Sequence, residues 1–475
     1  MKILALACLF SLIGLTGCAS TGVIQTREAG TSPVTEKSSP PKPASGADAA
    51  PAASPVGADL LPITAGLAAS RAVAALEPPA DLWERIRRGY GMPNLENSLV
   101  HDRELWYSRR ADYILRMTER SRKYLFHIVE ELERRNMPTE LALLPFVESA
   151  FNPQAVSTAK AAGMWQFIPS TGKNFELKQN AFRDDRRDVL ASTRAALDYL
   201  QKLYNMFGDW HLALAAYNWG EGSVGRAIAK SQRAGSGVGY TDINMPMETR
   251  FYVPKLQAIK NIVSDPSAFN SRLPHIENHP YFQSVDIKHD IDVALAAKLA
   301  EVPLADFKAL NPSVVNRPVI LAAGTPQILL PWDNAVIFQS NLEAYTGGRL
   351  ASWTVWLAPT TMKPSDAAKR VGMTELALRA VNNIPARVVI KAGSSLLVPR
   401  SPHLSTDVAL HLADNGQLSL GAERVAKSGA RKAGKAKPTR KLASAGKRKK
   451  GTGAAAARSP TKKKVRAVKR QGAVP

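Results

Sequence analysis

The apolar residues between positions 104 and 265 recur at helical spacing. Leu125, Ile128, Val129 and Leu132 stand at i, i+3, i+4 and i+7, which places all four on one side of a helix. A sustained alternation of apolar and polar residues, the mark of a half-buried strand, does not occur in this stretch. The pattern therefore predicts a domain built mainly from α-helices.

Polar capping residues and glycines predict where individual helices begin and end. Asp188 can cap a helix that ends at Gly208, and Asp209 can cap the next helix, which ends before Gly220. Pro138 can open a further helix, because proline is well tolerated in the first turn.

Two shorter units follow the helical stretch, and they resemble each other. Ala296-Ala297-Lys298 precedes Asn311 by the same spacing at which Ala367-Ala368-Lys369 precedes Asn382. Each unit begins with a short run of β-type residues and ends on an apolar run before a proline. The predicted order in each unit, residues 284–333 and 351–400, is strand, two short helices, strand.

The first residues are typical of an export signal. Residues 1–17 combine a basic start at Lys2 with an apolar run that is too short to span a membrane as a mature helix. Leu15-Thr16-Gly17-Cys18 matches a bacterial lipoprotein cleavage box, so Cys18 is the predicted lipidation site that anchors the chain to the membrane. Ala19 favours the periplasmic face of the outer membrane. The alternative is an ordinary signal peptide in which Cys18 stands by chance.

The two flanking segments have compositions that cannot bury a core. Residues 18–80 are rich in Pro, Ala, Ser, Gly and Thr, which predicts a disordered linker. Residues 401–475 are predicted to be a disordered basic tail, and 424–475 holds 19 of the 23 net positive charges without one acid, which leaves +4 for the remainder. We expect the tail to contact anionic envelope polymers or lipids, or to stay solvated. Nucleic acid is not expected as a partner, because the chain is predicted to be exported.

Candidate chemistry centres on Glu148. Its neighbours Phe146, Val147 and Phe151 are apolar, and apolar surroundings raise the pKa of a carboxyl group toward the range of a general acid. An isolated Glu of this kind is usually structural. Here three further motifs follow in order, beginning with Gly163-Met-Trp-Gln-Phe-Ile-Pro-Ser-Thr171, then Ala216-Tyr-Asn-Trp-Gly220, and finally a late Tyr252.

Together these motifs resemble those of the lytic transglycosylases of the goose-lysozyme-like family, in particular the membrane-bound murein transglycosylase D type. The resemblance is strongest over residues 85–265 and implies an all-α, lysozyme-like catalytic domain (SLT domain) at 131–268, preceded by a helical extension at 81–130. The two later units resemble βααβ LysM modules, which bind chains that contain N-acetylglucosamine. Both lack the usual Gly-Asp-Thr after the first strand, so the first module is degenerate, and glycan binding and a structural role both stay open for it.

The resemblance also implies the reaction. The substrate would be the glycan strands of peptidoglycan, cleaved between N-acetylmuramic acid and N-acetylglucosamine with formation of a 1,6-anhydro end, for cell-wall remodelling. Glu148 would act first as the acid and then as the base. The motifs offer no convincing second carboxylate, and the cluster of Asp184, Asp185 and Asp188 looks like the start of a helix. An intramolecular hydroxyl nucleophile would remove the need for one.

The remaining site residues are predicted from the same motifs. Ser149 would fix the loop of the acid, Ser157 and Gln166 would bind substrate, and Asn218 would satisfy backbone groups around the cleft. Tyr217 and Tyr252 would hydrogen-bond the acid or the substrate.

Trp165 and Phe167 are expected either to line sugar subsites or to pack in the core. Histidines are scattered, so neither a metal site nor a cofactor is expected. Two other functions stay open: a hydrolysing, lysozyme-like muramidase on the same fold, and a non-catalytic scaffold that binds the cell wall.

Overall fold

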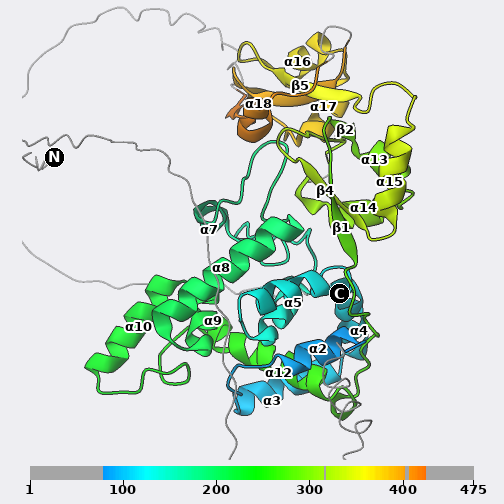
Figure 1. The fold of residues 1–475 in the computed structure, drawn as a ribbon. Coiled ribbons are helices and arrows are strands. Elements are labelled where there is room, and N and C mark those ends of the chain that lie inside the picture. Colours follow the sequence, from blue (N-terminus) through cyan, green and yellow to red (C-terminus); the bar gives the residue numbers. More distant parts are fainter. Residues whose placement is uncertain (1–78, 315–316, 402–405, 424–475) are drawn as a thin grey trace, which may run out of the picture. The chain divides into compact units, whose positions relative to one another are not determined.

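A computed structural model describes residues 79–314, 317–401 and 406–423. The described chain is mainly helical, as predicted, with short strands confined to the part after residue 280 (Figure 1). None of the helices in these ranges is both long enough and apolar enough to cross a bilayer. The predicted signal, Cys18 and most of the predicted linker lie outside the described residues.

Twelve helical elements make up the part that positions the site. They are α2 (Leu82–Arg88), α3 (Ser98–Ser108), α4 (Ala111–Ser121), α5 (Leu125–Arg134), the 3-10 helix η1 (Thr139–Leu143), α6 (Leu144–Ser149), α7 (Pro169–Asn174), α8 (Val189–Phe207), α9 (Trp210–Trp219), α10 (Glu221–Arg233), α11 (Met247–Arg250) and α12 (Tyr252–Ser264). A short 3-10 turn, η2 (Ser267–Phe269), follows them.

The predicted helix caps are present. The Asp188 carboxylate accepts hydrogen bonds from the Leu190 and Ala191 amides at the start of α8, and Gly208 ends this helix in the left-handed conformation. Asp209 accepts from the Leu212 amide at the start of α9. These caps fix the turn between α8 and α9 through local contacts, so the sequence determines where α8 ends and where α9 begins.

The helix predicted after Pro138 is broken into two pieces. Pro138 precedes η1, and the α-helix begins again only at Leu144. Pro145 explains the break, because it has no N–H to donate and its ring collides with a carbonyl one turn earlier inside a continuous α-helix. Glu148 therefore lies on a short helix, α6, in which that proline is the second residue.

Helix α12 holds the centre of the helical domain. It packs against α3, α6, α9 and η1. Its Lys260 ammonium lies 2.9 Å from a carboxylate oxygen of Glu140 on η1, and the two side chains are 11% and 1% exposed. Glu140 also accepts from the Gly91 and Met92 amides, so the buried charges are paired and hydrogen-bonded.

The two later units have the predicted βααβ order. In the first, β1 (Phe282–Asp286) pairs antiparallel with β4 (Gln327–Pro331), and in the second β5 (Trp353–Leu357) pairs antiparallel with β7 (Ser395–Pro399). The helices between them are α13 (Val293–Leu299) and α14 (Leu304–Leu310) in the first unit, and α16 (Pro364–Arg370) and α17 (Glu375–Asn382) in the second. The first unit adds β2 (Ile291–Asp292), η3 (Pro312–Val314), β3 (Val319–Ile320) and α15 (Asn334–Glu343), and the second adds β6 (Val388–Ile390), α18 (Leu410–Asn415) and β8 (Leu420–Ala422).

The repeated asparagine makes the same contacts in both units. The Asn311 amide group donates to the Phe307 and Leu329 carbonyls and accepts from the Leu329 amide. Asn382 makes the corresponding three bonds, to Leu378 and Leu397. Each buried asparagine thus ties the second helix to the last strand, which explains the repeat seen in the sequence.

The ordered chain extends beyond the predicted boundary at residue 401. Helix α18 and strand β8 lie after this point, and β8 pairs antiparallel with β6. Val408 and Ala413 are buried there. The prediction of disorder is therefore wrong for 406–423, because these residues carry enough apolar side chains to extend the second unit. The lysine-rich stretch 424–475 lies outside the described residues.

Candidate active site

The predicted site residues meet at one cavity of about 470 Å³ in the helical domain. Six of the seven line it: Glu148, Ser157, Gln166, Tyr217, Asn218 and Tyr252. Helix α6 supplies the acid, α9 supplies Tyr217 and Asn218 from its C-terminal end, and α12 begins with Tyr252. Segments more than 100 residues apart in the sequence therefore share one cavity.

Glu148 lies in surroundings that favour its neutral form. Burial raises the pKa of its carboxyl group to about 7, against the opposing effects of a hydrogen bond from Tyr252 and of the nearby charge of Lys255; the charge of Glu248 raises it further. The side chain still reaches solvent through the cavity. The pKa is therefore raised by the protein atoms that surround the carboxyl group, and not by complete exclusion of water. A carboxyl group with this pKa can donate a proton near neutral pH and take one back.

The two tyrosines have different partners. The Tyr252 hydroxyl donates to Oε1 of Glu148. The Tyr217 hydroxyl donates instead to the Trp165 carbonyl at 2.8 Å. Burial, reinforced by the charge of Glu148, raises the pKa of both hydroxyls well above their ordinary value. Tyr252 therefore stays a donor whatever the protonation state of Glu148.

Ser149 does not line the cavity but holds the loop that follows the acid. Its hydroxyl donates to the Met164 carbonyl at 3.0 Å and accepts from the Asn152 amide at 3.2 Å. Ala150 and Phe151 both have positive φ angles, 51° and 56°. Consecutive left-handed non-glycine residues are costly, and such strain tends to gather at functional sites.

The Gly163–Gln166 turn brings the second motif against this loop. Gly163 has φ of 86°, and a Cβ atom there would lie 1.9 Å from the Arg186 carbonyl oxygen, so only glycine fits. Gln166 also has a positive φ, 50°, and its amide nitrogen donates to the Gly163 carbonyl at 2.7 Å. Its carboxamide thus stabilises the turn while it lines the cavity.

The remaining motif residues divide between cavity and core. Ser157 lines the cavity, and its hydroxyl accepts from the Ala161 amide. Asn218 accepts from the Thr249 hydroxyl at 2.8 Å, where backbone partners were expected. Trp165 is fully buried and donates to Thr193, so it belongs to the core, whereas Phe167 lines the cavity.

Several cavity residues were not predicted as site residues from the sequence, among them Trp219, Glu248 and Lys255. Glu248, Tyr252 and Lys255 stand at i, i+4 and i+7, and this helical spacing was the signal that could have found two of them. Glu248 is exposed, and Lys255 is partly buried. The aspartate cluster at 184–188 does not line the cavity; Asp188 caps α8, as expected.

Among the described residues, no group of three or more His, Cys, Asp or Glu side chains could hold a metal ion.

Comparisons with known proteins agree with this geometry. Residues 127–237 match the family model of the transglycosylase SLT domain, and residues 281–347 match that of the LysM-like domain of lytic transglycosylase MltD. The matched LysM-like unit is the first of the two. This is the unit for which glycan binding and a structural role were both left open, because it departs from the usual LysM pattern.

Curated relatives match parts of the chain. Membrane-bound lytic murein transglycosylase D of Escherichia coli (strain K12) is 38% identical over 262 residues, 55% of this chain and 58% of the relative. A putative tributyltin chloride resistance protein of Alteromonas sp. (strain M-1) is 49% identical over 111 residues, 23% of this chain and 54% of that protein. The matches thus span little more than half the length of these relatives. The chain contains a transglycosylase SLT domain followed by an MltD-type LysM-like domain, and it is related to the membrane-bound lytic murein transglycosylases of type D.

Proposed function

We propose that this protein is a peptidoglycan lytic transglycosylase that cleaves the β-1,4 bond between N-acetylmuramic acid and N-acetylglucosamine and leaves a 1,6-anhydro end. The observation that carries the proposal is the environment of Glu148: a single walled-in carboxyl group with a pKa of about 7, held by Tyr252 in a cavity of about 470 Å³.

The reaction needs one group that first donates and then accepts a proton. Protonated Glu148 gives its proton to the glycosidic oxygen, and the bond from that oxygen to C1 of the muramoyl residue breaks. The 6-hydroxyl of the same residue attacks C1, and the Glu148 carboxylate removes the hydroxyl proton. The acid is regenerated and water is not consumed. Tyr252 stabilises the carboxylate between the two steps, because its hydroxyl stays protonated.

Glu248 supports the second candidate, a hydrolysing muramidase. It is a carboxylate in the same cavity, and most glycoside hydrolases use a second carboxylate to direct water or to attack the sugar. Its exposure argues against this role, because an exposed carboxylate is held less firmly than Glu148. A non-catalytic scaffold would have no need for a raised pKa at the base of a cavity.

Digestion of purified peptidoglycan should decide between these functions. We expect the wild-type protein to release fragments whose muramoyl ends are lighter by one water than hydrolysed ends, as read by mass spectrometry. The Glu248→Gln variant should keep its rate within about tenfold, because general acid–base groups are worth about 10²–10⁴-fold and Glu248 is not proposed to be one. Hydrated ends together with a loss of about 10²-fold or more in this variant would establish the hydrolase instead.

The pH dependence should follow the ionisation of Glu148. The first step needs the protonated acid, so we expect kcat/KM to fall as pH rises through about 7, the pKa of Glu148. The hydrogen bond from Tyr252 lowers this pKa, so Tyr252→Phe should shift the falling limb to higher pH. A profile that stays flat through neutrality in the wild-type protein would mean that another group donates the proton.

We also propose that the protein is exported and anchored through Cys18 at the periplasmic face of the outer membrane. The lipoprotein box at 15–18 supports this location, as does the name of the Escherichia coli relative, which calls that protein membrane-bound. The basic stretch 424–475 would then meet anionic envelope polymers or lipids.

A further inference from the structure

A second cavity adjoins the catalytic one. It has a volume of about 320 Å³ and lies between α10 and the segment that returns from this helix. We call it the α10 groove. The residues that line it include Trp219, Ser223, Arg226, Lys230, Asp242 and Asn244. Ser223, Arg226 and Lys230 follow one another at helical spacing, so one stripe of α10 forms a wall of the groove.

Trp219 lines both cavities. It is the residue after Tyr217 and Asn218, and Gly220, with φ of 91°, turns the chain from α9 into α10 directly behind it. A polymer bound in the catalytic cavity therefore meets the α10 groove at this indole ring. Aromatic side chains offer a large apolar face with a polar edge, which suits the two kinds of surface of a sugar ring.

The groove carries positive charge that the described protein does not neutralise. Neither Arg226 nor Lys230 has a carboxylate within ion-pair distance among the described residues, and Arg226 donates to the Ser223 hydroxyl at 3.0 Å. Asp242 is the one acid among the lining residues, and its carboxylate accepts from the Gly239 amide at 3.0 Å. Two cations against one anion leave the groove with a net positive charge.

Several arginines on other helices have a carboxylate partner, which these two cations lack within the described part of the chain. Arg134, Arg135 and Arg379 each pair with a glutamate four residues earlier. On α10 the residue four before Lys230 is Arg226, and like charges at this spacing destabilise a helix. The two cations are thus kept together at a cost in helix stability, which an anionic ligand would offset.

We propose that the α10 groove binds carboxylate groups displayed by the glycan strand next to the scissile bond, through Arg226 and Lys230. The inference rests on the proposed function, and it adds the chemical groups of the glycan strand that the protein binds beside the catalytic cavity. A muramoyl residue carries a carboxyl group on its lactyl ether. That group is free in peptide-stripped strands, and in peptide-bearing strands it is joined to a peptide stem that brings carboxylates of its own.

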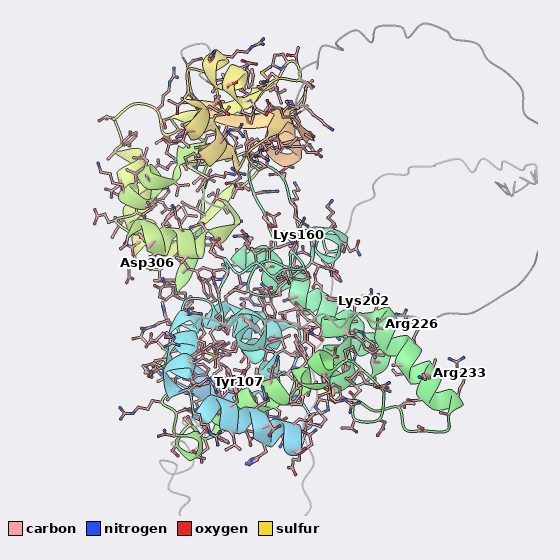
Figure 2. All side chains as sticks on the ribbon, turned by 180° about the vertical axis from the view of Figure 1, so that it is seen from behind. Tyr107, Lys160, Lys202, Arg226, Arg233 and Asp306 are labelled. Atoms are coloured by element: carbon pink, nitrogen blue, oxygen red, sulfur yellow. The ribbon has the colours of Figure 1, made fainter. Side chains whose placement is uncertain are left out.

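The test compares three strands of equal length: peptide-stripped, peptide-bearing but not cross-linked, and stripped with the muramoyl carboxyl groups reduced to alcohols. The full-length Arg226→Gln/Lys230→Gln variant is compared with wild type. The matched control is Arg233→Gln, because Arg233 lies on the same helix (Figure 2), outside the groove, and donates to the Ala229 carbonyl.

We expect KM of the double variant to rise about twofold to tenfold on a carboxylate-bearing strand, with kcat unchanged, since exposed charge pairs contribute modestly. Added salt should reduce the difference from wild type. On carboxyl-reduced strands the double variant should equal wild type, and Arg233→Gln should equal wild type on all three.

The glycan strand on which KM of the double variant rises identifies the carboxylate that the groove binds. A rise on stripped strands assigns the groove to the lactyl group, and a rise only on peptide-bearing strands assigns it to the stem. Unchanged KM on both, or an equal rise on the reduced strands, would overturn the proposal. If wild type cleaves none of the strands, the proposed function fails; Kd of the same strands for the Glu148→Gln protein, with and without the two α10 substitutions, then decides the groove separately.

Discussion

Replacing Glu148 with Gln is expected to lower the rate of glycan cleavage by about 10⁴-fold or more. A general acid or base is typically worth about 10²–10⁴-fold, and here one carboxyl group serves both steps. The amide keeps the shape and can still accept from Tyr252, so the variant loses the proton rather than the geometry. The measurement is the initial rate of release of anhydro-ended fragments; a rate within tenfold of wild type would remove Glu148 from the mechanism.

The stability of the same variant provides its control. The pKa of Glu148 is raised in the folded state, so folding is penalised once pH rises above the ordinary value for a carboxyl group and the charge must be held in the cavity. Glu148→Gln removes this penalty. Its Tm should exceed that of wild type above about pH 7, and the gain should vanish in acid, where the wild-type carboxyl group is protonated. A Tm below wild type at every pH would mean that lost activity reflects damage to the fold.

Replacing Lys260 with Met should destabilise the helical domain by about 3–5 kcal/mol, because it leaves the Glu140 carboxylate buried without its cation. Hydrogen exchange of the α12 amides measures the effect locally, which avoids treating a chain of several units as one two-state system.

Two further variants test this reason. Lys202→Met breaks an exposed pair with Glu221 and should cost at most about 1 kcal/mol. Glu140→Gln/Lys260→Met removes both buried charges and should recover part of the loss. Equal protection in Lys260→Met and wild type would show that the buried pair does not hold α12 in place.

The parts of the fold that were predictable depend on local chemistry. Asp188 and Asp209 cap their helices through amides two or three residues away, so the sequence alone is enough to place them. The break before Pro145 has a local cause as well, but the prediction of one helix after Pro138 did not take this proline into account. The repeated asparagine signalled a repeated fold, although the strand bonds that it makes became evident only in the structure.

The parts that were missed depend on contacts between distant segments. The motifs gathered six residues around one cavity, but Glu248 and Lys255 belong to no motif. They line the cavity because α12 packs against α6, and α11 packs against α9 and α12. Asn218 bonds to Thr249, a partner that only tertiary packing brings near. Strand β8 has three residues and gains its role from pairing with β6, so its own sequence gave little sign of order.

The bond between Tyr252 and Glu148 joins residues that are 104 positions apart in the chain. During synthesis the acid emerges long before its partner, and until the intervening helices have packed it is an ordinary solvated glutamate without a cavity. Closing so long a loop costs conformational entropy, and this cost is offset only when the hydrophobic core has packed. The environment that raises the pKa of Glu148 therefore forms only after α12 has been made and packed, late in the folding of the domain.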